Sequence, residues 1–222
     1  MKGSWLDSIS HFSVLWVFVG WAVCTASLTL PARADDDTAG GAASNSLGDY
    51  PDATLKTADG CDLALPDARG RVATVIMCMS VECPISNEFL PAIKEVAETY
   101  RQRGVTMVGI NPNAGESLEA MADYAKEHKL TFPFAKDEGG KVSRRLLFNV
   151  TPEARVFDAD GKIVYRGRID DRYRAGGGQP GAKITNDLAR ALDEVIAGKP
   201  LTQSRTRTVG CPIQLTVPGG GQ

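Results

Sequence analysis

The chain has 222 residues, of which 43% are apolar and 23% charged, a balance that can fill a globular core. Its 25 Lys and Arg residues against 27 Asp and Glu residues give a net charge of -2, and no long basic tract is present. This charge pattern argues against nucleic acid as the main partner, because phosphate binding needs concentrated Lys and Arg side chains.

Residues 1–34 have the features of a secretory signal peptide. Lys2 lies in a short polar start, residues 12–30 are mostly apolar, and Ala32-Arg33-Ala34 is a small-residue cleavage motif. Two alternatives are an uncleaved membrane anchor through residues 12–30 and a lipoprotein modified at Cys24. Each predicts an exported protein, periplasmic or extracellular, and a membrane contact only if this segment stays attached.

The remaining chain divides by composition into three parts. Residues 35–48 are small, polar and glycine-rich, which is typical of a disordered linker. Residues 49–200 alternate apolar runs with turn signals and form the expected domain. Residues 201–222 are polar again and predict a flexible C-terminal tail that carries Cys211.

Within the domain, the apolar spacing predicts strands and helices in alternation. The strands are expected at 53–57, 61–65, 72–79, 105–110 and 131–134, and in a hairpin around the Asp-Ala-Asp-Gly turn at 158–161; the helices are expected at 86–103, 117–129, 142–147 and 185–197. The order predicts an α/β fold, a mixed central sheet flanked by helices.

Two segments of the sequence carry a resemblance. SVECPIS at 80–86 and NVTPEARVFDADGKIVYRG at 149–167 resemble the thioredoxin-like superfamily, in its exported redoxin branch of AhpC/TSA-like and TlpA-like proteins. The resemblance covers residues 49–200. It implies a thioredoxin-like fold and a thiol-dependent oxidoreductase that acts on protein or small-molecule thiols and disulfides, without a cofactor.

The position of Cys83 predicts a nucleophilic thiolate. It lies between an expected strand and an expected helix, where the unpaired backbone N–H groups and the helix dipole favour the thiolate over the thiol. Pro84 suits the first helical turn, where a missing N–H has no cost. A buried, inert cysteine at a helix start is the alternative.

A second cysteine, Cys78, precedes Cys83 by five residues of expected strand, roughly 16 Å when fully extended. A disulfide needs Cα atoms within about 7 Å, so the pair is not expected to bond. Cys78 is better interpreted as a small buried apolar residue.

Ser86 stands where dithiol thioredoxins carry their second cysteine. A serine can hydrogen-bond the thiolate but cannot close a disulfide, so an oxidised Cys83 must be resolved by another thiol. Cys211 is the possible internal resolving residue, since a mobile tail can reach the site. The alternatives are that Cys211 takes no part and that an external thiol resolves the adduct.

Thr151-Pro152 resembles the cis-proline loop of the family, which lies opposite the cysteine; an ordinary trans proline is the alternative.

The resemblance also extends to peroxiredoxins, whose threonine or serine before the cysteine is matched by Ser80. However, Pro152 stands where their activating arginine is expected, and Arg155 is predicted on the next strand. The sequence therefore favours thiol–disulfide exchange over peroxide reduction.

The sequence also bears on metal binding and on a role without catalysis. A metal site is not expected, because residues 35–222 contain a single histidine, His128, and no Cys-x-x-Cys pair. Because the second active-site cysteine is absent, a binding or scaffold module that has kept the fold without turnover is the alternative to an enzyme.

Overall fold

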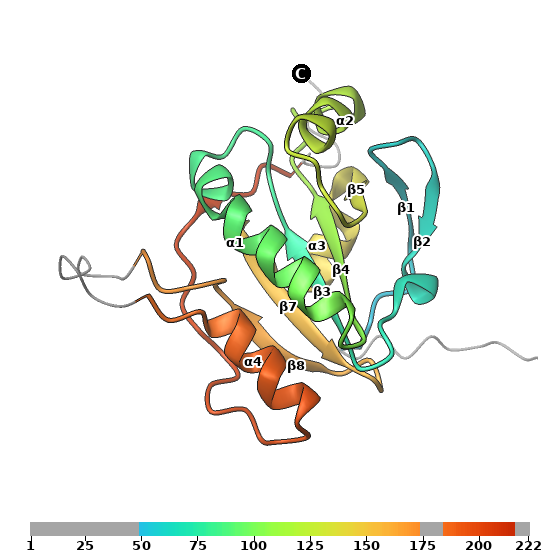
Figure 1. The fold of residues 1–222 in the computed structure, drawn as a ribbon. Coiled ribbons are helices and arrows are strands. Elements are labelled where there is room, and N and C mark those ends of the chain that lie inside the picture. The colour runs from blue at the N-terminus through green and yellow to red at the C-terminus, as the bar shows by residue number, and fades with distance from the viewer. Residues whose placement is uncertain (1–48, 174–183, 216–222) are drawn as a thin grey trace, which may run out of the picture. The chain divides into compact units, whose positions relative to one another are not determined.

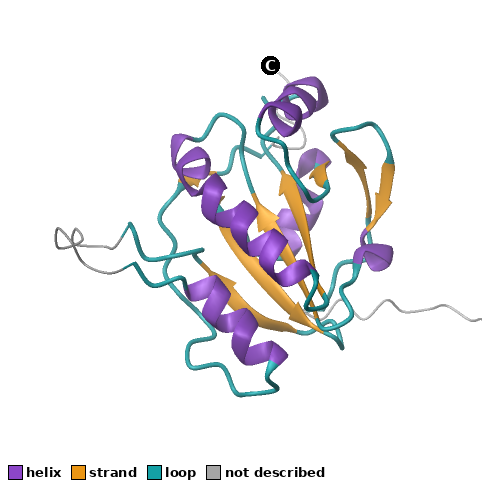
Figure 2. Cartoon of the chain, in the orientation of Figure 1, coloured by secondary structure: helices purple, strands orange, loops and turns teal. Residues whose placement is uncertain are grey.

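A seven-stranded mixed sheet forms the centre of the fold (Figures 1 and 2). The computed structural model describes residues 49–173 and 184–215; the predicted signal peptide, the predicted linker and residues 216–222 lie outside this part. The spatial order is β2-β1-β5-β4-β3-β7-β8, with bounds β1 (Thr54–Thr57), β2 (Asp62–Ala64), β3 (Ala73–Cys78), β4 (Val105–Asn111), β5 (Phe134–Lys136), β7 (Glu153–Asp158) and β8 (Ile163–Gly167). Parallel pairing joins β3, β4 and β5, and β7 runs antiparallel to β3.

Helices cover both faces of this sheet. Helices α1 (Pro84–Arg101) and α4 (Asp187–Ile196) lie on one face, and the short α3 (Lys141–Arg145) lies on the other (Figure 1). Helix α2 (Leu118–Glu127) packs into the same core as α1, and the 3-10 turns η1 (Leu65–Ala68) and η2 (Glu138–Gly140) complete the elements. This arrangement is the predicted thioredoxin-like α/β fold.

The central strand β3 explains why its sequence is apolar throughout. Val75 and Met77 belong to the core under α1 and α4, whereas Ile76 and Cys78 belong to the core on the α3 side. Alternate side chains of a strand point to opposite faces, so a strand covered on both sides needs apolar residues at every position. All six residues of β3 are buried.

The expected elements agree with the structure except in their bounds. Helix α1 begins at Pro84 rather than Ser86, because Cys83 is its N-cap. The strand expected at 131–134 was misplaced: β5 spans Phe134–Lys136, where its residues pair with β4 from Gly109 to Asn111. The position of this strand is set by its hydrogen-bond partners rather than by its apolar run.

The chain after α4 crosses the surface of the domain. We call residues 204–214 the strap. Its strand β9 (Cys211–Pro212) pairs with β6 (Val150–Thr151), and neither strand was predicted. A flexible tail was expected here, whereas the strap follows a defined path, because its backbone groups find partners on the domain.

Two backbone hydrogen bonds fix the ends of that path. Near its start, the N–H of Arg166 donates to the carbonyl of Ser204. Near its end, the N–H of Ile213 donates to the carbonyl of Asn149.

Among the residues that the structure describes, no helix combines the length and the apolar character required to cross a bilayer.

Candidate active site

Cys83 occupies the N-cap of α1, at the point where the chain leaves β3. Its Sγ lies 3.4 Å from the backbone N of Ser86, which points at the sulfur from the first helical turn. The N–H of Cys83 donates to Ser80 Oγ at 3.1 Å, so the loop before the helix is also fixed. The residue is only 3% exposed. The sulfur is therefore held against the unpaired donors of a helix N-terminus, the environment that favours a thiolate.

The Cys83 sulfur is bonded to Cys211. The Sγ–Sγ distance is 2.28 Å and the Cα–Cα distance is 6.1 Å, across 128 residues of sequence. Cys211 reaches this position because β9 pairs with β6, which sets Cys211 opposite Thr151. Cys211 is half-buried, whereas Cys83 is buried. The tail cysteine is thus brought to Cys83 by strand pairing.

The Thr151-Pro152 peptide bond is cis, as the resemblance implied. The carbonyl oxygen of Thr151 lies 3.4 Å from Cys83 Sγ, so this loop faces the sulfur directly. β6 ends at Thr151, and β7 begins at Glu153 directly after the proline. The two segments that carried the family resemblance therefore meet in space at the disulfide.

Two hydroxyl groups beside the disulfide lack partners. The Oγ of Ser86 and the Oγ1 of Thr151 are buried, and neither makes a hydrogen bond within the described parts of the chain. Ser86 is one helical turn from Cys83, and Thr151 faces it from the cis-proline loop. A buried hydroxyl without a partner is unfavourable, and neither of these two hydrogen-bonds the Cys83 sulfur in the disulfide; the hydroxyl of Ser86, one helical turn from Cys83, is the one that a rotamer change can bring toward a thiolate.

The other two described cysteines lie outside this site. Cys78 is fully buried on the α3 side of the sheet, and burial raises the pKa of its thiol well above the usual value. Cys61 is exposed beside the β1–β2 turn. The prediction that Cys78 is a buried apolar residue is confirmed, and the pairing of Cys78 with Cys83 is absent.

A buried carboxylate that the sequence analysis missed lies directly behind the site. Glu116, 4% exposed, accepts hydrogen bonds from Ser80 Oγ at 2.5 Å and from the N–H of Val81 at 2.7 Å. It also accepts from the side-chain amides of Asn111 at 2.6 Å and Asn113 at 2.8 Å. Four donors satisfy both carboxylate oxygens, as the burial of a charged group requires.

The same network reaches the strap. The Oδ1 of Asn113 accepts from the N–H of Gln214 at 2.8 Å, and the N–H of Ala114 donates to the carbonyl of Gln214 at 2.9 Å. The ammonium of Lys136 donates to the carbonyls of Asn113 and Glu116, and burial lowers the pKa of this lysine. One polar cluster therefore fixes both the loop before Cys83 and the end of the strap. The sequence did hold one signal for this cluster, a group of polar residues directly after β4. Loops at the carboxyl ends of parallel strands often carry function, so polar residues at that place are candidates for a site.

The groups that would activate a peroxide are engaged elsewhere. The only proton of the Ser80 hydroxyl goes to Glu116, so this oxygen cannot donate to the site at the same time. The guanidinium of Arg155 donates to the carbonyls of Leu146 and Leu147 and forms an ion pair with Glu153 at 2.8 Å. The hydroxyl of Ser80 and the guanidinium of Arg155 are therefore both committed to partners away from the sulfur.

A small pocket of about 170 Å³ opens at the disulfide. Its lining comes from the Cys83 loop, the loop after β4 and the strap, and includes Glu82, Asn113, Glu116 and Gln214. In the described part of the chain, no three side chains of His, Cys, Asp or Glu are grouped so that they could hold a metal ion. The pocket can admit a small polar group to the sulfur atoms.

Comparison with known proteins identifies a family for residues 48–166. The model of the AhpC/TSA family matches residues 48–166. Peroxiredoxin Q from the chloroplast of Sedum lineare is 30% identical over 54% of this chain and 67% of its own length. The thiol-disulfide oxidoreductase ResA of Bacillus cereus is 25% identical over 51% of this chain and 64% of its own length. The matches thus span about two thirds of these two relatives.

A solved structure matches more of the chain. The crystal structure of an uncharacterized conserved protein from Geobacillus kaustophilus superposes with a TM-score of 0.69 and 31% identity, over 76% of this chain and 92% of that one. The two proteins therefore share the same fold over most of their length.

Proposed function

Because the chain belongs to the AhpC/TSA family of redoxin enzymes, we propose that it is an exported thiol–disulfide oxidoreductase whose working thiols are Cys83 and Cys211. The observation that carries this proposal is the bond between these two sulfurs at the N-terminus of α1. Family membership sets aside the scaffold alternative, since the relatives are enzymes by name.

The first step is attack on a substrate disulfide by the Cys83 thiolate. A new S–S bond forms between Cys83 and one substrate sulfur, and the other substrate sulfur leaves as a thiolate. The N–H of Ser86 stabilises the negative sulfur before attack, and the unpartnered hydroxyl of Ser86 can join it. The cis-proline loop at Pro152 orients the adduct from the opposite side.

The second step resolves this mixed disulfide. The Cys211 thiolate attacks the Sγ of Cys83, the Cys83–Cys211 bond forms, and the remaining substrate sulfur leaves as a thiolate. The substrate has then gained two electrons and the protein has lost two. Strap docking supports this step, because the pairing of β9 with β6 holds Cys211 within bonding distance of Cys83.

Re-reduction starts from the other side of the bond. An external thiol can approach Cys211, which is half-buried, more easily than Cys83, which is 3% exposed. Attack on Cys211 expels the Cys83 thiolate, the leaving group that the helix N-terminus stabilises. A second thiol of the reductant then attacks the external sulfur on Cys211 and releases a reduced protein. The partners are therefore a disulfide substrate and a thiol reductant.

Peroxide reduction is the second candidate, and the likeness to peroxiredoxin Q favours it. In that reaction, the Cys83 thiolate attacks a peroxide oxygen to give a sulfenic acid and an alcohol or water, and Cys211 then displaces water. The commitments of Ser80 to Glu116 and of Arg155 to backbone carbonyls favour the first candidate, because neither of these two groups is then free to polarise the O–O bond.

The stoichiometry of thiol release tests the proposal. Reduced protein carrying Cys61→Ser, which removes the exposed thiol, should release two thiols from each molecule of a chromogenic disulfide and end with Cys83 bonded to Cys211. Adding Cys211→Ser should release one thiol quickly and leave a covalent adduct on Cys83, whereas adding Cys83→Ser should release one thiol only slowly, through Cys211, because Cys211 is not the N-cap of a helix. Hydrogen peroxide is the parallel substrate: faster oxidation of Cys83 by peroxide than by the disulfide would move the assignment to the second candidate.

A further inference from the structure

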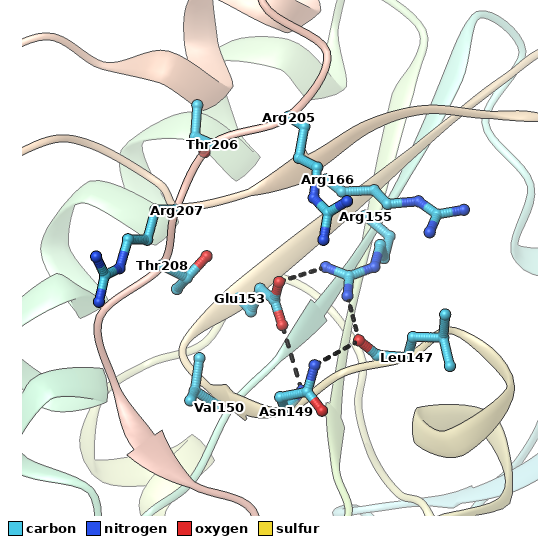
Figure 3. A pocket seen from close by; sticks show the side chains of 10 residues that line it. All are labelled: Leu147, Asn149, Val150, Glu153, Arg155, Arg166, Arg205, Thr206, Arg207 and Thr208. Atoms are coloured by element: carbon cyan, nitrogen blue, oxygen red, sulfur yellow. Dashed lines mark hydrogen bonds and ion pairs between the residues drawn. The ribbon is translucent and has the colours of Figure 1, made fainter.

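Three arginines stand in a row across three neighbouring segments of chain. Arg155 on β7 is paired in register with Arg166 on β8, and Arg166 forms a bridge with Arg205 on the strap. Residues paired across strands share a face, so the three side chains leave the same side of the extended sheet. Figure 3 shows all three in the wall of one cleft.

The charge of this row is only partly compensated. Arg155 is paired with Glu153 and with backbone carbonyls, whereas the guanidinium groups of Arg166 and Arg205 make no ion pair or hydrogen bond to any described residue. Burial lowers the pKa of Arg166, and the neighbouring charges of Arg155 and Arg205 lower it further. Like charges directly opposite each other destabilise a sheet, so the row is unfavourable unless a negative group joins it.

The cleft beside the row is large enough for a small molecule. Its volume is about 660 Å³, and Glu153, already paired, is its one acidic lining residue among the described residues. The hydroxyl of Thr208, also on the strap, is buried without a described partner and adds an unused donor to this wall. Arg207 lines the cleft as well, but in Figure 3 its guanidinium points away from the row.

We propose that this cleft binds a small polyvalent oxyanion, a phosphate or polycarboxylate compound, between Arg166 on the sheet and Arg205 on the strap. A guanidinium offers paired N–H donors that match the oxygens of phosphates and carboxylates, and its hydrogen bonds to them are charge-assisted. Two uncompensated charges call for an anion with more than one negative charge. The row is too short to follow a nucleic-acid backbone.

An anion in this position would stabilise the docked position of the strap on the sheet. Arg205 and Thr208 come from the strap that carries Cys211, whereas Arg155 and Arg166 come from the sheet. A ligand that binds only the docked strap stabilises that state, and by linkage opening of the strap becomes rarer as the ligand fills the site. On the proposed function, occupancy would slow reduction of the Cys83–Cys211 bond; the binding itself does not depend on that function.

Calorimetric titration of the oxidised full chain with inorganic pyrophosphate and with citrate tests the proposal, with sodium chloride at equal ionic strength as the reference. Binding of both supports an oxyanion site in general, and binding of one alone assigns the class to phosphates or to polycarboxylates. Arg205→Gln and Arg166→Gln should each weaken binding about tenfold through the loss of charge-assisted hydrogen bonds. Arg101→Gln, on α1, removes the same charge outside the cleft and should leave affinity unchanged.

The proposal is overturned if neither anion releases more heat than the chloride reference. It is also overturned if Arg205→Gln binds as the unsubstituted protein does, or if Arg101→Gln weakens binding as much as Arg205→Gln, because general screening would then explain the effect. Since the readout is binding, the proposal stands or falls separately from thiol turnover: a chain without redox activity that binds pyrophosphate through Arg205 would leave it intact.

Discussion

Gly210 lies where the strap crosses Thr151, and its replacement by alanine is expected to weaken the bond between Cys83 and Cys211. A Cβ atom at Gly210 would lie 2.3 Å from the carbonyl oxygen of Thr151 and 2.9 Å from its carbon. Real Cβ atoms essentially never approach closer than 3.0 Å. The strap must therefore move by about 0.7 Å, the difference between 2.3 Å and 3.0 Å, against backbone atoms that cannot rotate away.

The size of the effect follows from the pairing that this movement disturbs. Thr151 is the residue paired with Cys211, the direct neighbour of Gly210. Each backbone hydrogen bond lost costs about 1 kcal/mol, so losing one or two of them costs about 1–2 kcal/mol. The oxidised protein cannot avoid this cost, because the disulfide holds the strap in place, whereas the reduced protein can release the strap. Gly210→Ala should therefore shift the equilibrium toward the dithiol by about five- to thirtyfold.

Equilibration with reduced and oxidised glutathione measures this shift, with acid quenching and alkylation to count the Cys83–Cys211 bond. Gly115→Ala is the matched control, because Gly115 also lines the disulfide pocket but has nothing within 4 Å of its added Cβ. The control should have the equilibrium of the unsubstituted protein. An unchanged equilibrium in Gly210→Ala would refute the reasoning, since the strap would then not depend on close contact with Thr151.

Three other predictions concern Ser86, Glu116 and Cys78. Ser86→Ala should raise the pKa of the reduced Cys83 thiol by up to about one pH unit, measured by alkylation rate, while leaving the oxidised protein as stable as before, because the hydroxyl has no described partner there. Glu116→Gln should lower the free energy of unfolding, measured by urea titration, by about 2 kcal/mol, because the NH₂ group of glutamine would face groups that donate to the carboxylate, such as Ser80 and Asn111. The control Glu119→Gln, on the exposed side of α2, should change the free energy of unfolding little. Burial raises the pKa of the Cys78 thiol, so its contribution to stability is complete below the pKa of an unfolded cysteine and is lost as the pH rises above it. Between about pH 8 and 10, the unsubstituted protein should therefore lose more free energy of unfolding than Cys78→Ala does. Equal losses in the two proteins would contradict the burial argument.

The parts of the site that were predictable depend on local sequence. The apolar run of β3 and the following Cys83-Pro84 are encoded by neighbouring residues, whereas the cis bond at Pro152 was implied by the family resemblance; the structure has all three. The buried state of Cys78 also followed from its neighbours. Reach alone argued against its bonding to Cys83, since an extended strand holds the two sulfurs apart.

The parts that were missed depend on pairing between distant segments. TQSRTRTVG at 202–210 has the composition of an unstructured tail, and its docking depends on partners on β6 and β8 that no local pattern specifies. Glu116 is an ordinary helix-flanking carboxylate in the sequence, and only the fold collects four donors around it. The arginine row arises from strand register, which one residue of slip would destroy.

Mapping the disulfide after a single turnover shows whether Cys83 and Cys211 are the working pair. Fully reduced protein would receive one equivalent of a protein disulfide, be quenched with acid within the first turnover, and be digested for mass spectrometry. The account predicts one new linkage, Cys83 to Cys211, with Cys61 and Cys78 recovered as thiols. Recovery of Cys83 as a free thiol after the substrate has been reduced, or its linkage to Cys78 or Cys61, would contradict the account.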